Sequence, residues 1–306
     1  MTDTFQKPKR RKVNHFLQNL AGILMAITPL VGYLLFGFIP LIVAIIMSFN
    51  DVNGYSLIGM EYVGLQNYIK VIKDPKFWLS LRNTMIMALS MPVSLVLSLL
   101  IAYLLSKGLK GAKTFRVIYF IPFVCSVVAV TYMWQWIFNT NFGVLNQWIG
   151  RTGEDAIDWL GTEKTFWISV IIMNIWSGTG YGIVLYSASL TNVPRTLLEQ
   201  AEIDGANALQ RFRHVTLPAI SPTTFYLFTM GLIGSLQAFA VPNILANGGT
   251  GPDDAGLTAV YYIYRNVFSY VNQMGIAAAA SWILAIIITI ITSINFLTSR
   301  YWVNYD

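Results

Sequence analysis

Charged residues are missing from six long stretches of this 306-residue chain. Asp, Glu, Lys and Arg make up only 11% of it, and none of them occurs in the ranges 16–50, 83–106, 117–150, 165–194, 214–252 and 266–299. Each stretch exceeds the roughly 20 residues that a helix needs to cross the core of a bilayer. An ordinary soluble domain is therefore excluded, and six membrane spans are the simple count.

Cysteine and histidine are scarce as well. Because Cys125 is the single cysteine, no disulfide or cysteine-ligated metal site can form within the chain. The two histidines, His15 and His214, lie near expected membrane boundaries, and no pair of carboxylates lies within a span. A membrane enzyme would therefore lack both a metal site and an acid–base pair. The phosphate-binding sequence G-x-x-x-x-G-K-[ST] is also missing, so any ATP hydrolysis must come from another subunit.

Apolar residues make up 55% of the chain. Their runs are too long and continuous for barrel strands, and a helix satisfies its own backbone hydrogen bonds in lipid. The expected fold class is an all-α integral membrane protein. Its six helices are expected at 21–48, 82–106, 117–138, 165–190, 223–245 and 276–298.

The distribution of Lys and Arg predicts the orientation of these helices. With the N-terminus inside, the cytoplasmic segments hold thirteen basic residues and the outer segments hold seven. Both termini are therefore expected in the cytoplasm. The basic cluster at 7–12 abuts the first span and has no aromatic residues among its charges, which favours contact with anionic lipid over nucleic-acid binding. The first apolar run is too long for a signal peptide, so we expect it to remain as a span.

One membrane unit accounts for the chain. The expected parts are a basic cytoplasmic segment at 1–20, a transmembrane domain at 21–299 and a cytoplasmic tail at 300–306. The second outer loop, 139–164, carries the acidic residues Glu154, Asp155, Asp158 and Glu163. They fit either a partner at the outer surface or plain solvation.

The segment 191–222 is polar, although it lies between two apolar runs. Leu197, Leu198 and Ala201 would share one face of a first helix, with Glu199 and Glu202 on another. Acidic residues on the polar face disfavour an anionic lipid surface and favour docking into a groove on another protein.

The middle of this segment predicts a break between two helices. Asp204-Gly205 suits a turn, because glycine readily adopts a positive φ and aspartate bonds to nearby backbone. A second helix would follow from Ala206, with Phe212 on its apolar face. We expect it to end at Leu217-Pro218.

The spacing in this segment resembles a known motif. Glu-x-Ala-x-x-x-Gly, nine residues, an aliphatic residue and x-Leu-Pro resemble the "EAA" loop of permease subunits in binding-protein-dependent ABC importers. The positions that match are Glu199, Ala201, Gly205, Val215, Leu217 and Pro218, while Gln200 replaces the more usual alanine. Segments 63–68 and 83–84 also resemble the maltose-type sugar permeases, so the likeness extends over nearly the whole sequence.

The resemblance implies a set of partners. Two permease subunits form the pathway, an ATPase dimer binds ATP and Mg, and an extracytoplasmic binding protein delivers a carbohydrate. A location in a prokaryotic cytoplasmic membrane is also implied. This chain would bind no cofactor itself. By resemblance, the residues that couple to the ATPase are Glu199, Ala201, Glu202, Asp204, Gly205, Phe212, Leu217 and Pro218.

Polar residues within the spans are candidates for a solute pathway, because they are costly facing lipid. Amide and hydroxyl groups suit sugar hydroxyls, and an aromatic ring can cover an apolar sugar face. The candidates are Ser126, Asn174, Ser177, Gly178, Ser235, Gln237 and Phe239. Small and polar residues also hold helices together, so a packing role stays open for each of them.

Two other transport functions stay open. The missing ionisable residues in the spans favour a neutral solute over an ion-coupled one. Within ABC importers, another organic solute such as a glycerol phosphodiester is the alternative to a carbohydrate. A stand-alone secondary transporter is an alternative of a different class, and the docking loop argues against it.

Overall fold

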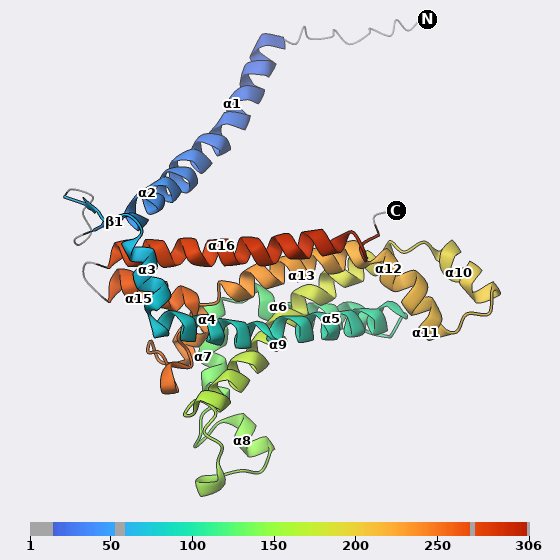
Figure 1. The fold of residues 1–306 in the computed structure, drawn as a ribbon. Coiled ribbons are helices and arrows are strands. Elements are labelled where there is room, and N and C mark those ends of the chain that lie inside the picture. The colour runs from blue at the N-terminus through green and yellow to red at the C-terminus, as the bar shows by residue number, and fades with distance from the viewer. Residues whose placement is uncertain (1–14, 53–58, 270–272, 305–306) are drawn as a thin grey trace, which may run out of the picture.

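The computed structural model of this protein describes residues 15–52, 59–269 and 273–304, and it is built mostly from helices (Figure 1). The α-helices are α1 His15–Tyr33, α2 Ile39–Ser48, α3 Gln66–Lys73, α4 Pro75–Ala88, α5 Ser90–Ser106, α6 Ala112–Val124, α7 Val127–Ile137, α8 Val144–Trp148, α9 Glu163–Thr191, α10 Arg195–Ile203, α11 Ala208–Arg211, α12 Leu217–Ala219, α13 Ser221–Leu236, α14 Ala240–Leu245, α15 Ala259–Phe268 and α16 Met274–Ser299. Two π-helical turns, η1 Leu34–Phe38 and η3 Phe212–Thr216, and two 3₁₀ turns, η2 Gly153–Asp155 and η4 Pro252–Asp254, complete the helices. The strands β1 Asn50–Asp51 and β2 Glu61–Tyr62 form a short antiparallel pair.

The first span leaves the rest of the molecule. α1, η1 and α2 follow one another without a break; α1 points away from the other helices, whereas α2 packs against α16 (Figure 1). In the range Gly22–Ser48, none of the most apolar 18-residue window is buried. The end of α2 is also held by the buried Asn67, which donates from Nδ2 to the carbonyls of Ser48 (3.1 Å) and Asn50 (2.9 Å). The expected basic segment 1–20 lies mostly outside the described residues.

A bundle of long helices forms the body of the protein, in which α5 packs along α9. Ser98 Oγ donates to the carbonyl of Thr179 at 3.0 Å. Gly182 faces the same serine, since a Cβ added there would meet Ser98 Oγ at 2.4 Å. Glycine thus lets the two helices approach closely, as small residues do between membrane helices.

The third expected span, 117–138, is not one straight helix. α6 and α7 meet at an angle of 100°, because Cys125 (ψ 153°) and Ser126 (ψ 126°) are extended. Pro122 precedes this break by less than one turn and cannot donate a backbone hydrogen bond. The expectation of a continuous span was therefore wrong at this point.

The fifth expected span, 223–245, is also interrupted. α13 ends at Leu236, and Phe239 (φ −140°, ψ −56°) separates it from the short α14. At its other end, α13 meets the 208–219 helical segment at 65°. The expected span therefore combined one helix with a separate short one.

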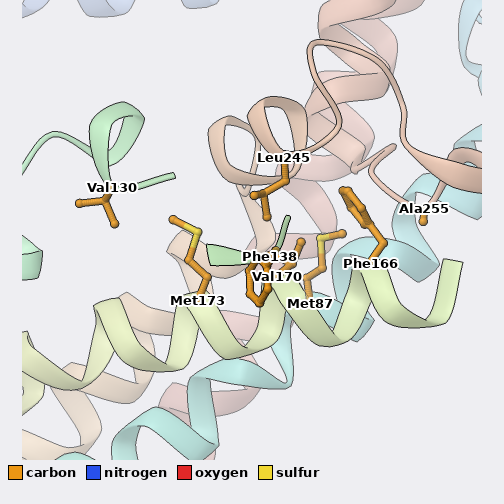
Figure 2. Close-up of a cluster of buried hydrophobic side chains, with 8 residues drawn as sticks. All are labelled: Met87, Val130, Phe138, Phe166, Val170, Met173, Leu245 and Ala255. Carbon is orange, nitrogen blue, oxygen red and sulfur yellow. The ribbon is translucent and has the colours of Figure 1, made fainter. Parts of the chain in front are cut away.

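A buried apolar cluster explains where the chain goes after these breaks. Figure 2 shows Phe166, Val170 and Met173 of α9 beneath Leu245 of α14. The remaining members of the cluster are Met87, Val130, Phe138 and Ala255. α7 and α14 are thus held against the same part of α9 by close packing of apolar side chains, whose many small dispersion contacts add up.

Four helical segments are long and apolar enough to cross a membrane, and up to six if each bent pair counts as one span, among the residues described. The four are Gly22–Ser48, Pro75–Ser106, Glu163–Thr191 and Met274–Ser299. The expected spans 21–48, 165–190 and 276–298 agree with these closely. The span expected at 82–106 begins earlier, at Pro75, because Asp74 caps its helix from the N-terminal side.

Candidate functional site

The segment 192–220 extends beyond the ends of α5 and α13 as a pair of short helices (Figure 1). α10 forms the first, and α11, η3 and α12 form the second. We call this segment the protruding loop. Its position at the end of the bundle leaves most of both helices exposed.

Gly205 ends α10 in the way that the sequence predicts. Its φ of +79° lies in the left-handed region. The backbone N–H of Gly205 donates to the carbonyl of Glu202 (3.0 Å), and that of Ala206 donates to Ala201 (2.9 Å). These two bonds form a Schellman motif, which satisfies carbonyls that the helix end leaves free. Glycine is favoured here by backbone conformation alone, since a Cβ would meet nothing within 4 Å.

Asn207 begins the second helix with a capping box. Its Oδ1 accepts from the N–H of Gln210 at 3.0 Å, and Gln210 Oε1 accepts from the N–H of Asn207 at 2.8 Å. A capping box satisfies two donors that would otherwise be free at a helix N-terminus. The turn between the two helices is therefore fixed on both sides.

The two helices form a concave surface at the turn, around an open depression of about 330 Å³. It is lined by Ala201, Asp204, Gly205, Ala206, Gln210, His214 and Val215. Three of the predicted coupling residues, Ala201, Asp204 and Gly205, thus come together here. Glu199 lies on the exposed side of α10, and Glu202 pairs with Arg211 instead.

Two exposed apolar side chains flank this concave surface. Ile203 is 86% exposed and Leu209 is 74% exposed. Both lie outside the long apolar stretches. Large apolar side chains in exposed positions often mark an interaction site. Sequence reasoning did not select Ile203, but its position between Glu202 and Asp204, on an otherwise polar turn, was the available signal.

Phe212 turns toward the bundle and away from the concave surface. Its ring lies 4.6 Å from that of Tyr103 at the end of α5, measured between centroids. The Nζ atom of Lys107 lies 4.7 Å from the centroid of the same tyrosine ring. Of the predicted coupling residues, Phe212 is thus the one that contacts a membrane helix through an aromatic pair.

Leu217 and Pro218 lie in the last turn of the second helix, which ends one residue beyond its expected end at Leu217-Pro218. The chain continues as α12 to Ala219 and bends only at the buried Ile220. The preceding π-helical turn explains this tolerance: the N–H of Leu217 bonds back to Phe212, one residue farther than in an α-helix. This shift in register lets the helix continue past a residue without an N–H.

The base of the protruding loop is anchored in a buried cluster. Val193 before α10 and Ile220 after α12 pack with Ala102 of α5, Tyr186 of α9 and Leu227 of α13. Leu198 of α10 packs against the same cluster. Both ends of the loop are therefore fixed to the same helices.

Three of the predicted pathway residues, Asn174, Ser177 and Gly178, lie on α9. Asn174 is half-buried, and Ser177 Oγ is buried without a hydrogen-bond partner among the described residues. A Cβ at Gly178 would meet Ser94 Oγ at 2.9 Å. Gly178 therefore faces α5.

The other four pathway candidates lie at the helix breaks or near them. Ser126 is exposed where α6 meets α7, and Gln237 is exposed just after α13. Ser235 Oγ donates to the carbonyl of Leu232 at 2.9 Å, and the Phe239 ring lies 5.5 Å from that of Tyr261. Within the described part of the chain, no hydrogen bond or ring contact joins any two of the seven candidates.

Two of the four acidic side chains in the outer loop bond to other residues of the chain. Glu163 pairs with Arg82, and Asp158 Oδ1 accepts from Thr140 Oγ1 at 3.3 Å. Glu154 and Asp155 stay exposed. Across residues 15–52, 59–269 and 273–304, no three His, Cys, Asp or Glu side chains gather where they could hold a metal ion.

Comparison with known proteins identifies relatives over nearly the whole chain. Residues 81–302 match the family described as "binding-protein-dependent transport system inner membrane component". A probable ABC transporter permease protein of Bacillus subtilis (strain 168) is 33% identical over 292 residues, which cover 94% of this chain and 93% of the relative. The arabinooligosaccharides transport system permease protein of the same organism is 32% identical, over 86% of this chain and 83% of its own.

A solved structure shares the fold. It is described as a bacterial alginate ABC transporter in complex with alginate pentasaccharide-bound periplasmic protein. One of its chains aligns with a TM-score of 0.79 and 24% identity, covering 95% of this chain and 98% of that chain.

Proposed function

The chain belongs to the family of binding-protein-dependent transport system inner membrane components, and from this premise we propose that it forms part of the membrane pathway of an ATP-driven carbohydrate importer. The observation that carries the proposal is the protruding loop, with its concave surface around Gly205. An exposed, internally fixed pair of helices at one end of a membrane bundle is suited to docking a soluble subunit.

The proposed topology has six spans with both termini in the cytoplasm. In this arrangement the broken pair α6–α7 contributes one span, and α13, which follows the protruding loop, contributes another. The loop at 107–111, the protruding loop and the C-terminal end of α16 lie at the same end of the bundle (Figure 1). These segments include Lys107, Lys110, Arg195, Arg211 and Arg300, and such basic residues favour the cytoplasmic side.

The proposed partners are a second permease subunit, a dimer of ATPase subunits and an extracytoplasmic binding protein. ATP and Mg would be bound by the ATPase, since this sequence lacks the phosphate-binding motif. The complex would reside in the cytoplasmic membrane of a prokaryotic cell. The exposed length of Gly22–Ser48 is consistent with contact to lipid, to another subunit or to both.

The proposed substrate class is carbohydrate, with oligosaccharides as the main candidates. Support comes from the relative that transports arabinooligosaccharides and from the absence of ionisable residues in the long apolar stretches. Asn174 of α9, together with Gln237 after α13, offers amide groups that can bond to sugar hydroxyls.

The mechanism follows from how the loop is built. An ATPase subunit that holds the concave surface would carry α10 and α11 with it when ATP closes the dimer. The loop base is packed against α5, α9 and α13 through Val193 and Ile220, so its displacement must shift those helices or strain the cluster. Binding energy would thereby favour one of two pathway conformations, which is the requirement for coupled transport.

Reconstitution tests this function. The chain, co-purified with its partners, is placed in liposomes with internal ATP·Mg, and uptake of a panel of labelled oligosaccharides is measured with the binding protein outside. We expect at least one saccharide to accumulate only with ATP. ATP-independent movement of solute by this chain alone would indicate a secondary transporter, and accumulation of a glycerol phosphodiester alone would replace the carbohydrate assignment.

A further inference from the structure

The protruding loop presents two different faces. One is the concave surface around Gly205, which is open to solvent. The other carries Phe212, whose ring lies 4.6 Å from that of Tyr103 on α5. A residue that already packs on a membrane helix is poorly placed to enter a groove on a soluble partner. The two faces therefore suit different tasks.

The Phe212 contact lies at an unusual point of the backbone. Phe212 begins the π-helical turn η3, and its carbonyl accepts the N–H of Leu217. π-helical turns inside helices are rare and occur often at functional positions, because the helix register can change there. The half-buried Tyr103 ring, with Lys107 Nζ 4.7 Å from its centroid, holds Phe212 from the α5 side.

α5 connects the Tyr103–Phe212 contact to the other helices of the bundle. Ser98, on the same helix as Tyr103, bonds to the Thr179 carbonyl of α9 at 3.0 Å. α9 in turn meets α6 closely, since a Cβ at Gly180 would lie 2.0 Å from the carbonyl oxygen of Tyr119. α6 ends at Val124, directly before Cys125, where the third span breaks. A continuous series of close contacts thus connects the loop to the break.

We propose that Phe212 and Tyr103 are positioning residues that transmit movement of the protruding loop to α5, whereas the Gly205 surface holds the ATPase. This inference rests on the proposed function. It assigns Phe212 a role within this chain, in place of the direct ATPase contact implied by the family motif. Removal of either ring should leave the ATPase bound but weaken its effect on the membrane helices.

The native Cys125 provides the readout. The complex co-purified with this chain is treated with N-ethylmaleimide, without nucleotide and with ATP plus orthovanadate, and labelling of this chain is followed by its intact mass. In the wild type we expect the Cys125 labelling rate to differ between the two states by about five-fold or more, the size of a typical coupling effect. F212A and Y103A should each lose most of that difference and still retain the ATPase subunit.

Three comparisons separate transmission from general damage. Y103F keeps the ring and should behave as the wild type. F296A removes a ring from another aromatic pair, Phe225–Phe296 (5.0 Å), which joins α13 to α16 outside this route, and should also keep the nucleotide effect. The F212A/Y103A double variant should be no worse than either single variant, because each substitution removes the same ring contact.

Four results decide the inference. Loss of the nucleotide effect in F212A and Y103A, with the ATPase retained, supports it. An undiminished effect in both variants would overturn it, and so would loss of the ATPase from either one, since the pair would then act in docking. A wild-type complex whose Cys125 labelling ignores nucleotide would also contradict it. If no ATPase accompanies the wild type, the proposed function itself fails.

Discussion

Arg211 on the second helix of the protruding loop pairs with Glu202 on the first, with 2.5 Å between Nη1 and Oε2. The pair bridges the turn at Gly205 and the capping residue Asn207. Because it links α10 to α11 directly, it helps to fix the angle between the two helices that form the concave surface. Glu202 was predicted as a contact to the ATPase, and its position assigns it a task within the loop as well.

Breaking this pair should weaken ATPase docking more than it weakens the fold. The Glu202 side chain is 66% exposed, and exposed ion pairs contribute only about 0–1 kcal/mol to stability. We expect E202Q and R211Q to lower ATPase retention in a pull-down by a few-fold at low salt, with little change in melting temperature. The charge-swapped variant E202R/R211E should recover retention. If it stays as defective as the single variants, the residues contact the ATPase directly.

Close packing of α5 and α6 on α9 should make two glycines of α9 hard to replace. A Cβ at Gly182 would meet Ser98 Oγ at 2.4 Å, and one at Gly180 would meet the Tyr119 carbonyl at 2.0 Å. Overpacking costs typically about 1–3 kcal/mol. We therefore expect both alanine variants to melt earlier in detergent, with G180A the worse because its obstacle is backbone.

The matched control is Gly234 on α13, where a Cβ would meet nothing within 4 Å. G234A should melt at the wild-type temperature or slightly above it, since alanine favours a helix. The S98G/G182A double variant should regain part of the stability lost in G182A. Equal melting of G182A and the wild type would show that α5 and α9 are not held this closely.

Asn67 should be needed to hold the first span to the body of the protein. It is buried to 1% exposure, and its Nδ2 is the donor to both Ser48 and Asn50. Leaving a buried carbonyl without a donor costs about 1–3 kcal/mol. We expect N67A, and still more N67D, to increase proteolytic cleavage near residues 49–62, while the exposed neighbour variant Q66A does not. Unchanged cleavage in N67D would contradict this role.

Asn174 should affect transport without affecting stability. No hydrogen bond within the described residues holds its amide, whereas Asn295 donates to Thr229 Oγ1 at 2.7 Å in a buried position. A lost hydrogen bond of about 1.4 kcal/mol corresponds to a tenfold change in affinity. We expect N174A to lower saccharide uptake by about that factor at an unchanged melting temperature. N295A should instead lower the melting temperature, because it removes a buried hydrogen bond.

The sequence predicted the uninterrupted spans well and missed the breaks. Long charge-free runs at 165–190 and 276–298 coincide with single helices, because a lipid environment leaves few other backbone conformations. The extended residues Cys125 and Ser126 lie in an equally apolar run. Hydropathy cannot report such a break, and the local signal for it was Pro122. The packing that α7 then makes against α9 and α14 joins residues far apart in the sequence.

The protruding loop could be predicted in outline and not in its internal contacts. Local signals, above all Gly205, indicated two helices and the turn between them. The Tyr103–Phe212 ring pair joins residues far apart in the sequence, and no spacing rule predicts such a contact. The continuation of the helix through Pro218 depends on the π-helical turn before it, which propensity does not predict either.

The most direct measurement for the central claim is a pull-down of this chain from detergent, comparing the wild type with G205N and G205V. Left-handed backbone at Gly205 (φ +79°) costs most residues about 1–2 kcal/mol but is tolerated better by asparagine. A second permease and an ATPase should accompany the wild type. G205N should retain part of the ATPase, and G205V should lose it. If the wild type purifies alone, or G205V retains the ATPase fully, the loop is not the docking site.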